Sequence, residues 1–145
     1  MTTVNIYLNF NGNCEEAFNF YKSIFGGDFT YLGRFEKVPE SEGMPPMPDS
    51  MKNKILHIAL PISKETVLMG SDIGGEWAPE FRQGTNFSIS ANTDNKAEAD
   101  RIFAGLSIGG IITMPMAIAF WGDYFGMCTD KFGVNWMVNF NQGNG

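Results

Sequence analysis

The sequence predicts an α+β protein in which a βαβββ module occurs twice in tandem. Two segments that alternate apolar and polar residues, 4–10 and 85–91, are typical of half-buried strands. Each is followed by an amphipathic segment that ends in a glycine pair, as expected for a helix with a left-handed cap. A constant offset places Asn5 on Asn86. The pattern therefore predicts a strand, a helix and three strands in each half.

The first module begins with the strand 4–10, on which apolar and polar side chains should face opposite ways. Its polar side carries Asn5, Tyr7 and Asn9. Asn13 stands three residues before Glu16, the spacing of a capping box, and the helix that follows should end at Gly26-Gly27. The remaining strands of this module are expected at 28–36, 55–60 and 66–72.

The second module repeats this plan. On its first strand, Phe87, Ile89 and Ala91 should face a helix that is capped by Asp94 and ends at Gly109-Gly110. Strands are expected near 111–115, 122–129 and 134–140. The predicted buried faces of the two helices are Cys14, Ala17, Phe18, Tyr21, Ile24 and Phe25 in the first, and Ala99, Ile102, Phe103 and Leu106 in the second.

Residues 37–54 show no periodic pattern and contain four prolines and three methionines. Loops of this length within a compact domain are commonly lids or disordered segments. We interpret the segment as a flap of the first module. A functional flap and plain disorder are both compatible with this composition.

Length and charge limit the class of protein. A chain of 145 residues fits one domain, with module one at about 1–80 and module two at about 81–145. The net charge of -6 argues against nucleic acid and against an anionic membrane surface as partners. The sequence shows neither a leader-like start nor an apolar run of spanning length, so we expect a cytoplasmic location. Cys14 and Cys128 are expected to be two reduced thiols.

The C-terminal region carries two aromatic–glycine clusters, 120–126 and 132–136, with the spacing WG…FG…DxFGxxW. This stretch resembles the signature of the vicinal-oxygen-chelate superfamily (glyoxalase, bleomycin resistance and dioxygenase proteins), and most of all its PhnB-like branch. The resemblance implies that the two βαβββ modules form a partly open, curved β-barrel around a cavity, with the helices outside. The polar strand residues Asn5, Asn9, Asn86 and Ser88 would suit the lining of such a cavity.

The resemblance also implies where a metal ion would be bound. In metal-dependent members, His and Glu ligands come from the first and last strands of each module. The corresponding positions in this sequence are Asn5, Met69, Asn86 and Met137. The side-chain amide of Asn is a weak oxygen ligand for a metal ion, and the thioether of Met binds soft copper in preference to harder divalent ions. We therefore predict no metal and no cofactor, and we predict that these four residues contact a small-molecule ligand together with Tyr7.

His57 is the only histidine of the chain and the candidate catalytic residue. Strand parity places it on one face with Ile55 and Ala59, next to the strand of Met69. An imidazole there could orient a ligand or act as a base, because its pKa lies near neutrality. The alternative is a hydrogen-bonded structural histidine.

Further candidates have structural alternatives as well. Asp123 and Trp121 lie at the expected mouth of the cavity, and each could bind a ligand. Alternatively, Asp123 could stabilise a turn and Trp121 could pack in the core. Asp72 ends a strand and favours a turn role, and Trp136 favours packing. No glycine-rich turn of the kind that binds nucleotides or S-adenosylmethionine opens either helix.

Three functions remain open. The first is a metal-free protein that binds or sequesters a small molecule. The resemblance implies a homodimer, because bleomycin-resistance proteins hold their ligand in a groove between two subunits. The second is a metal-dependent glyoxalase-like lyase or isomerase, or a dioxygenase, with atypical ligands among His57, Asp72, Asp123, Glu40 and Glu42. The third is a non-catalytic module that binds a protein partner. Whether the chain is an enzyme is thus left open by the sequence.

Overall fold

The computed structural model describes residues 2–37, 48–73 and 81–142. The chain forms two compact units, Met1–Phe81 and Arg82–Gly145. Most of the predicted flap, 38–47, lies outside the described residues, as do Glu40 and Glu42. The described ends of that flap are short helical turns, η1 (Phe35–Lys37) and α2 (Asp49–Lys52).

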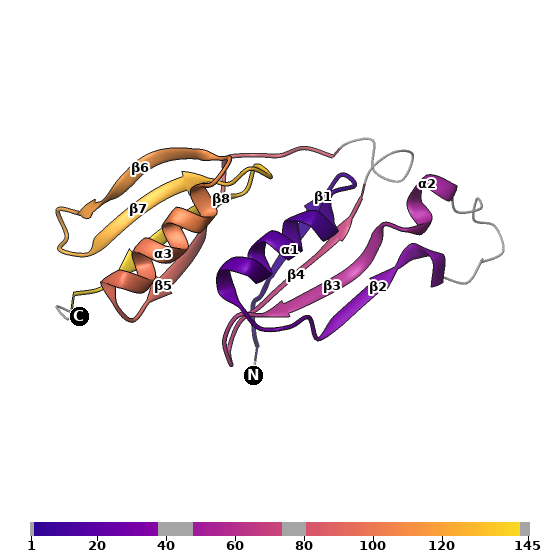
Figure 1. The fold of residues 1–145 in the computed structure, drawn as a ribbon, viewed down its shortest axis with the longest axis horizontal. Coiled ribbons are helices and arrows are strands. Elements are labelled where there is room, and N and C mark those ends of the chain that lie inside the picture. Colours follow the sequence, from indigo (N-terminus) through magenta and orange to yellow (C-terminus); the bar gives the residue numbers. More distant parts are fainter. Residues whose placement is uncertain (1, 38–47, 74–80, 143–145) are drawn as a thin grey trace. The chain divides into compact units, whose positions relative to one another are not determined.

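The first unit has the predicted order of one strand, one long helix and three strands (Figure 1). Its elements are β1 (Ile6–Phe10), α1 (Cys14–Phe25), β2 (Tyr31–Arg34), β3 (Ile55–Pro61) and β4 (Val67–Asp72). The strands form one mixed sheet in the order β1-β4-β3-β2. β1 and β4 are parallel, whereas β3 is antiparallel to both of its neighbours. The connection through α1 therefore carries the chain from β1, at one edge of the sheet, to β2 at the other edge.

The second unit repeats this topology with β5 (Ile89–Thr93), α3 (Lys96–Ser107), β6 (Ile111–Ile118), β7 (Tyr124–Thr129) and β8 (Asn135–Phe140). Its sheet has the order β5-β8-β7-β6, again with the first and last strands parallel. The predicted pair of βαβββ modules is thus confirmed. The described strands form two separate four-stranded sheets that are not closed into a barrel.

Each long helix lies along one face of its own sheet (Figure 1). The buried residues of α3 are Ala99, Ile102, Phe103 and Leu106, as predicted, and those of α1 agree except that Phe25 is only half-buried. Glycine allows close packing in the first unit, since a Cβ on Gly70 would lie 2.7 Å from Cε1 of Phe18. The core of each unit therefore lies between one helix and one sheet. Across the described residues, no helix combines the length and apolar character that crossing a bilayer requires.

Three local predictions about the ends of elements were wrong. Asn13 precedes α1, but its side chain makes no capping hydrogen bond, so the predicted capping box is not formed. The strand expected at 85–91 begins only at Ile89, so Asn86 and Phe87 precede it, and Phe87 is 52% exposed. The cap of α3 is Asn95 rather than Asp94, because the Asn95 side chain accepts a 2.7 Å hydrogen bond from the backbone N–H of Glu98. Asn95 and Glu98 have the spacing of a capping box, whereas Asp94 lies one residue too early.

A β-bulge changes which residues share a face in the first sheet. Gly33 pairs with His57, but the next residue, Arg34, pairs with Ile55, so Leu56 is an extra residue on β3. His57 and Ile55 therefore point to opposite sides of the sheet. The prediction that they share a face was wrong, because strict alternation does not survive a bulge.

Candidate functional site

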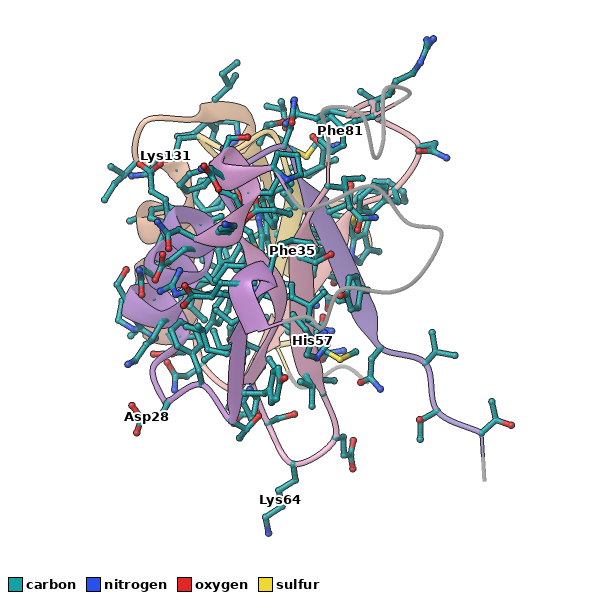
Figure 2. All side chains as sticks on the ribbon, turned by 90° about the vertical axis from the view of Figure 1, so that its right-hand side faces the viewer. Asp28, Phe35, His57, Lys64, Phe81 and Lys131 are labelled. Atoms are coloured by element: carbon teal, nitrogen blue, oxygen red, sulfur yellow. The ribbon has the colours of Figure 1, made fainter. Side chains whose placement is uncertain are left out.

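Each sheet has a face that its own helix does not cover, which we call the helix-free face. In the first sheet this face carries Tyr7, Met69, Ala59 and Tyr31, which are paired in that order across the four strands. His57 belongs to the same face because it lies two residues from Ala59 on β3 (Figure 2). Strand pairing thus brings together residues that are far apart in the sequence.

Tyr7, His57 and Tyr31 are in direct contact and form what we call the tyrosine–imidazole cluster. The hydroxyl oxygen of Tyr7 lies 3.1 Å from Nδ1 of His57, which is hydrogen-bonding distance. The ring centroids of Tyr7 and Tyr31 lie 5.5 Å and 5.4 Å from that of the imidazole. Tyr7 and Tyr31 remain 45% and 53% exposed, so their rings are available to a ligand.

Gly33 provides the space for the Tyr31 ring. A Cβ at Gly33 would lie only 2.9 Å from the hydroxyl oxygen of Tyr31 and 3.0 Å from Cε1. Because Gly33 pairs with His57 on the adjacent strand, its missing side chain lets Tyr31 lean towards the imidazole. Sequence analysis missed both residues, although the alternation of the segment 28–36 places them on one side of a strand.

The described polar groups of this face include no carboxylate, ammonium or guanidinium group. They belong to Tyr7, Asn9, Tyr31, His57 and Ser71, and Met69 adds a thioether between Tyr7 and Ala59. Asn5, a further predicted ligand contact, precedes β1, where its side-chain oxygen accepts a hydrogen bond from the backbone N–H of Val67 at 3.4 Å. The structure therefore brings the predicted residues Tyr7, Met69 and His57 together and leaves Asn5 at the margin.

The helix-free face of the second sheet has a different character. Met137 pairs with Met127, and Met127 pairs with Met114, so three thioethers lie side by side on neighbouring strands. Ser90 pairs with Met137 on the other side. Of these residues sequence analysis identified Met137 alone, because the registers of β6 and β7 are needed to place the others.

Trp121 and Asp123 lie in the connection between β6 and β7. The half-exposed Trp121 ring packs edge-on against Phe125 at 5.2 Å, and Asp123 accepts a 3.2 Å hydrogen bond from the side-chain amide of Asn139. Phe125 and Asn139 are themselves paired on the helix-free face. Both predicted residues therefore border that face, whereas Asn86 is an exposed residue ahead of β5.

Asp72 is not part of the tyrosine–imidazole cluster. It is only 2% exposed and accepts hydrogen bonds from the backbone N–H groups of Gly12, Cys14 and Ile55 at 2.8–3.0 Å. These contacts join the start of α1 to the start of β3. Asp72 therefore has a structural role, but these hydrogen bonds join distant segments and do not cap the turn after β4 that sequence analysis predicted.

The two thiols are free and buried. Burial raises the pKa of the Cys14 thiol, and the carboxylates of Asp72 and Glu15 add to the increase. Burial also raises the pKa of Cys128. Both groups therefore stay protonated near neutral pH and are poor nucleophiles and poor metal ligands.

The residues at the family's metal positions do not fit a hard or borderline divalent ion. Those positions offer the amides of Asn5 and Asn86 and the thioethers of Met69 and Met137, with no carboxylate and no imidazole. Within the described ranges, no three His, Cys, Asp or Glu residues come together as a metal site. The available chemistry of the tyrosine–imidazole cluster is instead hydrogen bonding and ring contact.

The fold is that of the glyoxalase/bleomycin-resistance proteins. A glyoxalase/bleomycin resistance protein/dioxygenase family enzyme from Burkholderia phytofirmans matches 92% of this chain and 95% of its own, with a TM-score of 0.60 and 13% identity. At that identity the likeness concerns the fold alone. Protein PA1353 from Pseudomonas aeruginosa is more similar, with 40% identity, a TM-score of 0.80 and coverage of 97% of this chain and 98% of that chain.

A family described as 3-demethylubiquinone-9 3-methyltransferase matches residues 2–139. The chain belongs to this family, which is the PhnB-like branch of the fold. A Bacillus cereus protein described as a putative 3-demethylubiquinone-9 3-methyltransferase, PhnB protein, has the same fold, with a TM-score of 0.74, 24% identity and coverage of 96% of this chain and 99% of its own.

Proposed function

We propose that this protein binds a small organic molecule on the helix-free face of its first sheet, without a divalent metal ion. The observation that carries the proposal is the tyrosine–imidazole cluster, in which two half-exposed rings border an imidazole that is hydrogen-bonded to one of them. Ligand sites commonly combine aromatic surface with a small number of placed polar groups. The cluster has this combination.

The donor groups support the metal-free part of the proposal. The enzyme alternative needs carboxylates near His57, yet Asp72 is held by backbone N–H groups on the other side of the sheet. The carboxylate of Asp123 accepts a hydrogen bond from the side-chain amide of Asn139. Among the described residues, the aromatic rings in contact with His57 are those of two tyrosines, which suit an organic ligand better than a hard cation.

Ligand binding is tested by NMR spectroscopy of the isotope-labelled protein. The single histidine gives one set of imidazole signals, so a ligand at the cluster is detected without assignment ambiguity. We would titrate planar aromatic metabolites, with a short-chain ubiquinone and S-adenosylmethionine as the two probes that the family's description suggests. We expect shifts of the imidazole and of backbone amides on β1, β3 and β4. Shifts confined to other elements, or none with any compound, would contradict the proposal.

A matched pair of variants separates the site from general effects. Tyr7→Phe removes the hydroxyl that contacts His57. It should lower the affinity for a ligand found in the titration severalfold. Tyr124→Phe removes the hydroxyl that donates to Asp100 on α3 of the second unit, and it should leave binding unchanged. Equal effects of the two changes would argue against the cluster as the site.

Metal content is measured on protein purified without a metal-binding tag. Elemental mass spectrometry should find no stoichiometric divalent ion, also after incubation with Zn, Ni, Mn or Fe(II), because thioethers and amides hold these ions weakly. The His57 signals should keep their linewidths when paramagnetic Mn(II) is added. Near one ion per chain, or broadening of the imidazole at equimolar Mn(II), would contradict the metal-free function.

A further inference from the structure

We propose that the helix-free face of the first sheet selects planar ligands that carry a hydrogen-bond acceptor, to which the Nε2–H group of His57 donates. This inference rests on the function proposed above and names the ligand class of the same face. It follows from the contact between Tyr7 and His57, from the absence of a described acceptor at Nε2 and from the uncharged residue types that surround the ring.

The contact between Tyr7 and His57 sets the tautomer. A neutral imidazole has one nitrogen that donates and one that accepts, and a phenol hydroxyl is a good donor to the accepting nitrogen. We therefore assign the Tyr7 hydroxyl, whose oxygen lies 3.1 Å from Nδ1, as the hydrogen-bond donor to Nδ1, and this assignment places the ring hydrogen on Nε2. Tyr7 is therefore a positioning residue for the donor on the far side of the ring.

The Nε2–H group is left for a ligand. Among the described residues, none provides a hydrogen-bond acceptor to Nε2. Tyr7 comes from β1 and Tyr31 from β2, so the two rings reach His57 from opposite sides of β3 in the sheet. An imidazole N–H group that no described acceptor occupies can donate to a ligand that supplies an oxygen or nitrogen lone pair.

The neighbouring groups restrict the rest of the ligand. The described residues of this face include no Lys, Arg, Asp or Glu, so a charged group on the ligand finds no opposite charge there. Two tyrosine rings and the Met69 thioether favour contact with a flat conjugated ring. The combination points to a planar ring with a carbonyl or similar uncharged acceptor, rather than to a sugar, a phosphate or an amine.

Two bicyclic probes of similar size test this ligand class. Coumarin is planar and only accepts hydrogen bonds, whereas indole is planar and its N–H group only donates. We would titrate each into the wild-type protein and follow the His57 ring nitrogens and the amides of the face by NMR. We expect coumarin to bind about tenfold more tightly, the factor that one ordinary hydrogen bond supplies, and to shift Nε2 more than Nδ1.

Three variants assign the effect to the proposed groups. His57→Leu should abolish the preference for coumarin while both probes still bind weakly. Tyr7→Phe should move the Nδ1 signal towards that of a free imidazole and reduce the preference, whereas Tyr124→Phe should change neither. Gly33→Ala keeps every polar group but displaces the Tyr31 ring, so it should lower the affinity for both probes by the same factor.

The outcomes separate the two proposals. Equal binding of coumarin and indole, tighter binding of indole, or a wild-type imidazole that carries its hydrogen on Nδ1 would each overturn the ligand class while leaving small-molecule binding intact. If neither probe shifts His57 or any amide of the face, and the metabolite titration is also negative, both proposals fail. The comparison of the two probes needs only the wild-type protein, so it does not depend on the folding of a variant.

Discussion

Two buried carboxylates, one in each unit, hold backbone segments in place. Asp72 accepts three backbone N–H groups in the first unit. Asp130, which is 3% exposed, accepts the N–H groups of Phe132 and Val134 and the indole N–H of Trp136 at 2.8–3.1 Å. Hydrogen bonds to an ionised carboxylate are stronger than those between neutral groups. The aspartate and tryptophan of the C-terminal signature thus serve the structure, which explains why that signature indicates the fold and not the reaction.

Replacing Asp130 by Asn should lower the free energy of unfolding by about 2–3 kcal/mol, because an amide provides one acceptor oxygen and places an NH₂ group among buried donors. Urea unfolding followed by tryptophan fluorescence measures the change. Asp94→Asn, at an exposed position, is the matched control and should change the free energy of unfolding little. An Asp130→Asn protein as stable as this control would show that the carboxylate charge is not needed.

The ion pair between Glu15 and Arg34 should make stability depend on pH. Arg34 donates to both carboxylate oxygens of Glu15, at 2.7 Å and 3.0 Å, and this hydrogen bonding lowers the pKa of Glu15 below its ordinary value of 4.5. A carboxyl whose pKa is lower in the folded state contributes stability above that ordinary value and loses it as the pH falls through the folded value.

Glu15→Gln should therefore destabilise the protein by about 0.5 kcal/mol at pH 7, a typical value for a partly exposed pair, and the difference from wild type should shrink at pH 3. Urea titrations at the two pH values measure it. The exposed neighbour Glu16, changed to Gln, is the control and should show no such dependence. A cost of Glu15→Gln that is the same at both pH values would contradict the electrostatic explanation.

At the level of the elements, the helices followed their sequence patterns closely and the strands did so less. The apolar faces of α1 and α3 repeat every three to four residues within one element, so nothing outside the element is needed to predict them. Strand faces also depend on pairing. The extra residue Leu56 in β3 turned Ile55 away from His57, and no local pattern signals that bulge.

Close packing of α1 on the first sheet gives a third prediction. A Cβ at Gly70 would lie 2.7 Å from the Phe18 ring and 2.9 Å from the backbone oxygen of Leu8, and one of the two is rigid main chain. Gly70→Ala should therefore cost about 1–3 kcal/mol through overpacking. Thermal unfolding measures it against Gly84→Ala, where the nearest group is the side chain of Asn86. Equal melting temperatures of the two variants would show that the packing is looser than these distances indicate.

For the whole molecule, the edge strand β6 is the surface to test for self-association. It forms one edge of the second sheet, and its exposed apolar residues include Ile111, Ile112, Met114 and Ile118. Exposed apolar surface of this kind commonly marks an interaction site. The homodimer implied by the family resemblance would cover such a surface.

We expect sedimentation equilibrium to report a dimer. The double variant Ile112→Lys/Ile118→Lys should raise the dissociation constant of this dimer at least tenfold. Charges on a buried apolar interface are costly, because they lose hydration without gaining a partner. Ile62→Lys, at an exposed position in the first unit, is the control and should leave the association unchanged. A wild-type protein that remains monomeric at high concentration would contradict the expectation.

The sequence by itself determined the two βαβββ modules, the helix faces and the family. Each depends on local regularities: alternation along a strand, three-and-four spacing along a helix, glycine pairs and the C-terminal aromatic–glycine motif. It also identified Tyr7, Met69 and His57 as candidate site residues, which strand pairing brings onto one face. Their role as a binding site remains a prediction.

Only the tertiary structure decided how the candidate site is assembled. Tyr7, Tyr31 and His57 come from three different strands, and they meet because of the register of those strands and the bulge at Leu56. Register is set by pairing between distant segments, and a shift by one residue would move a side chain to the opposite face. Sequence periodicity is a property of one segment, so it cannot determine which side chains of separate strands come into contact.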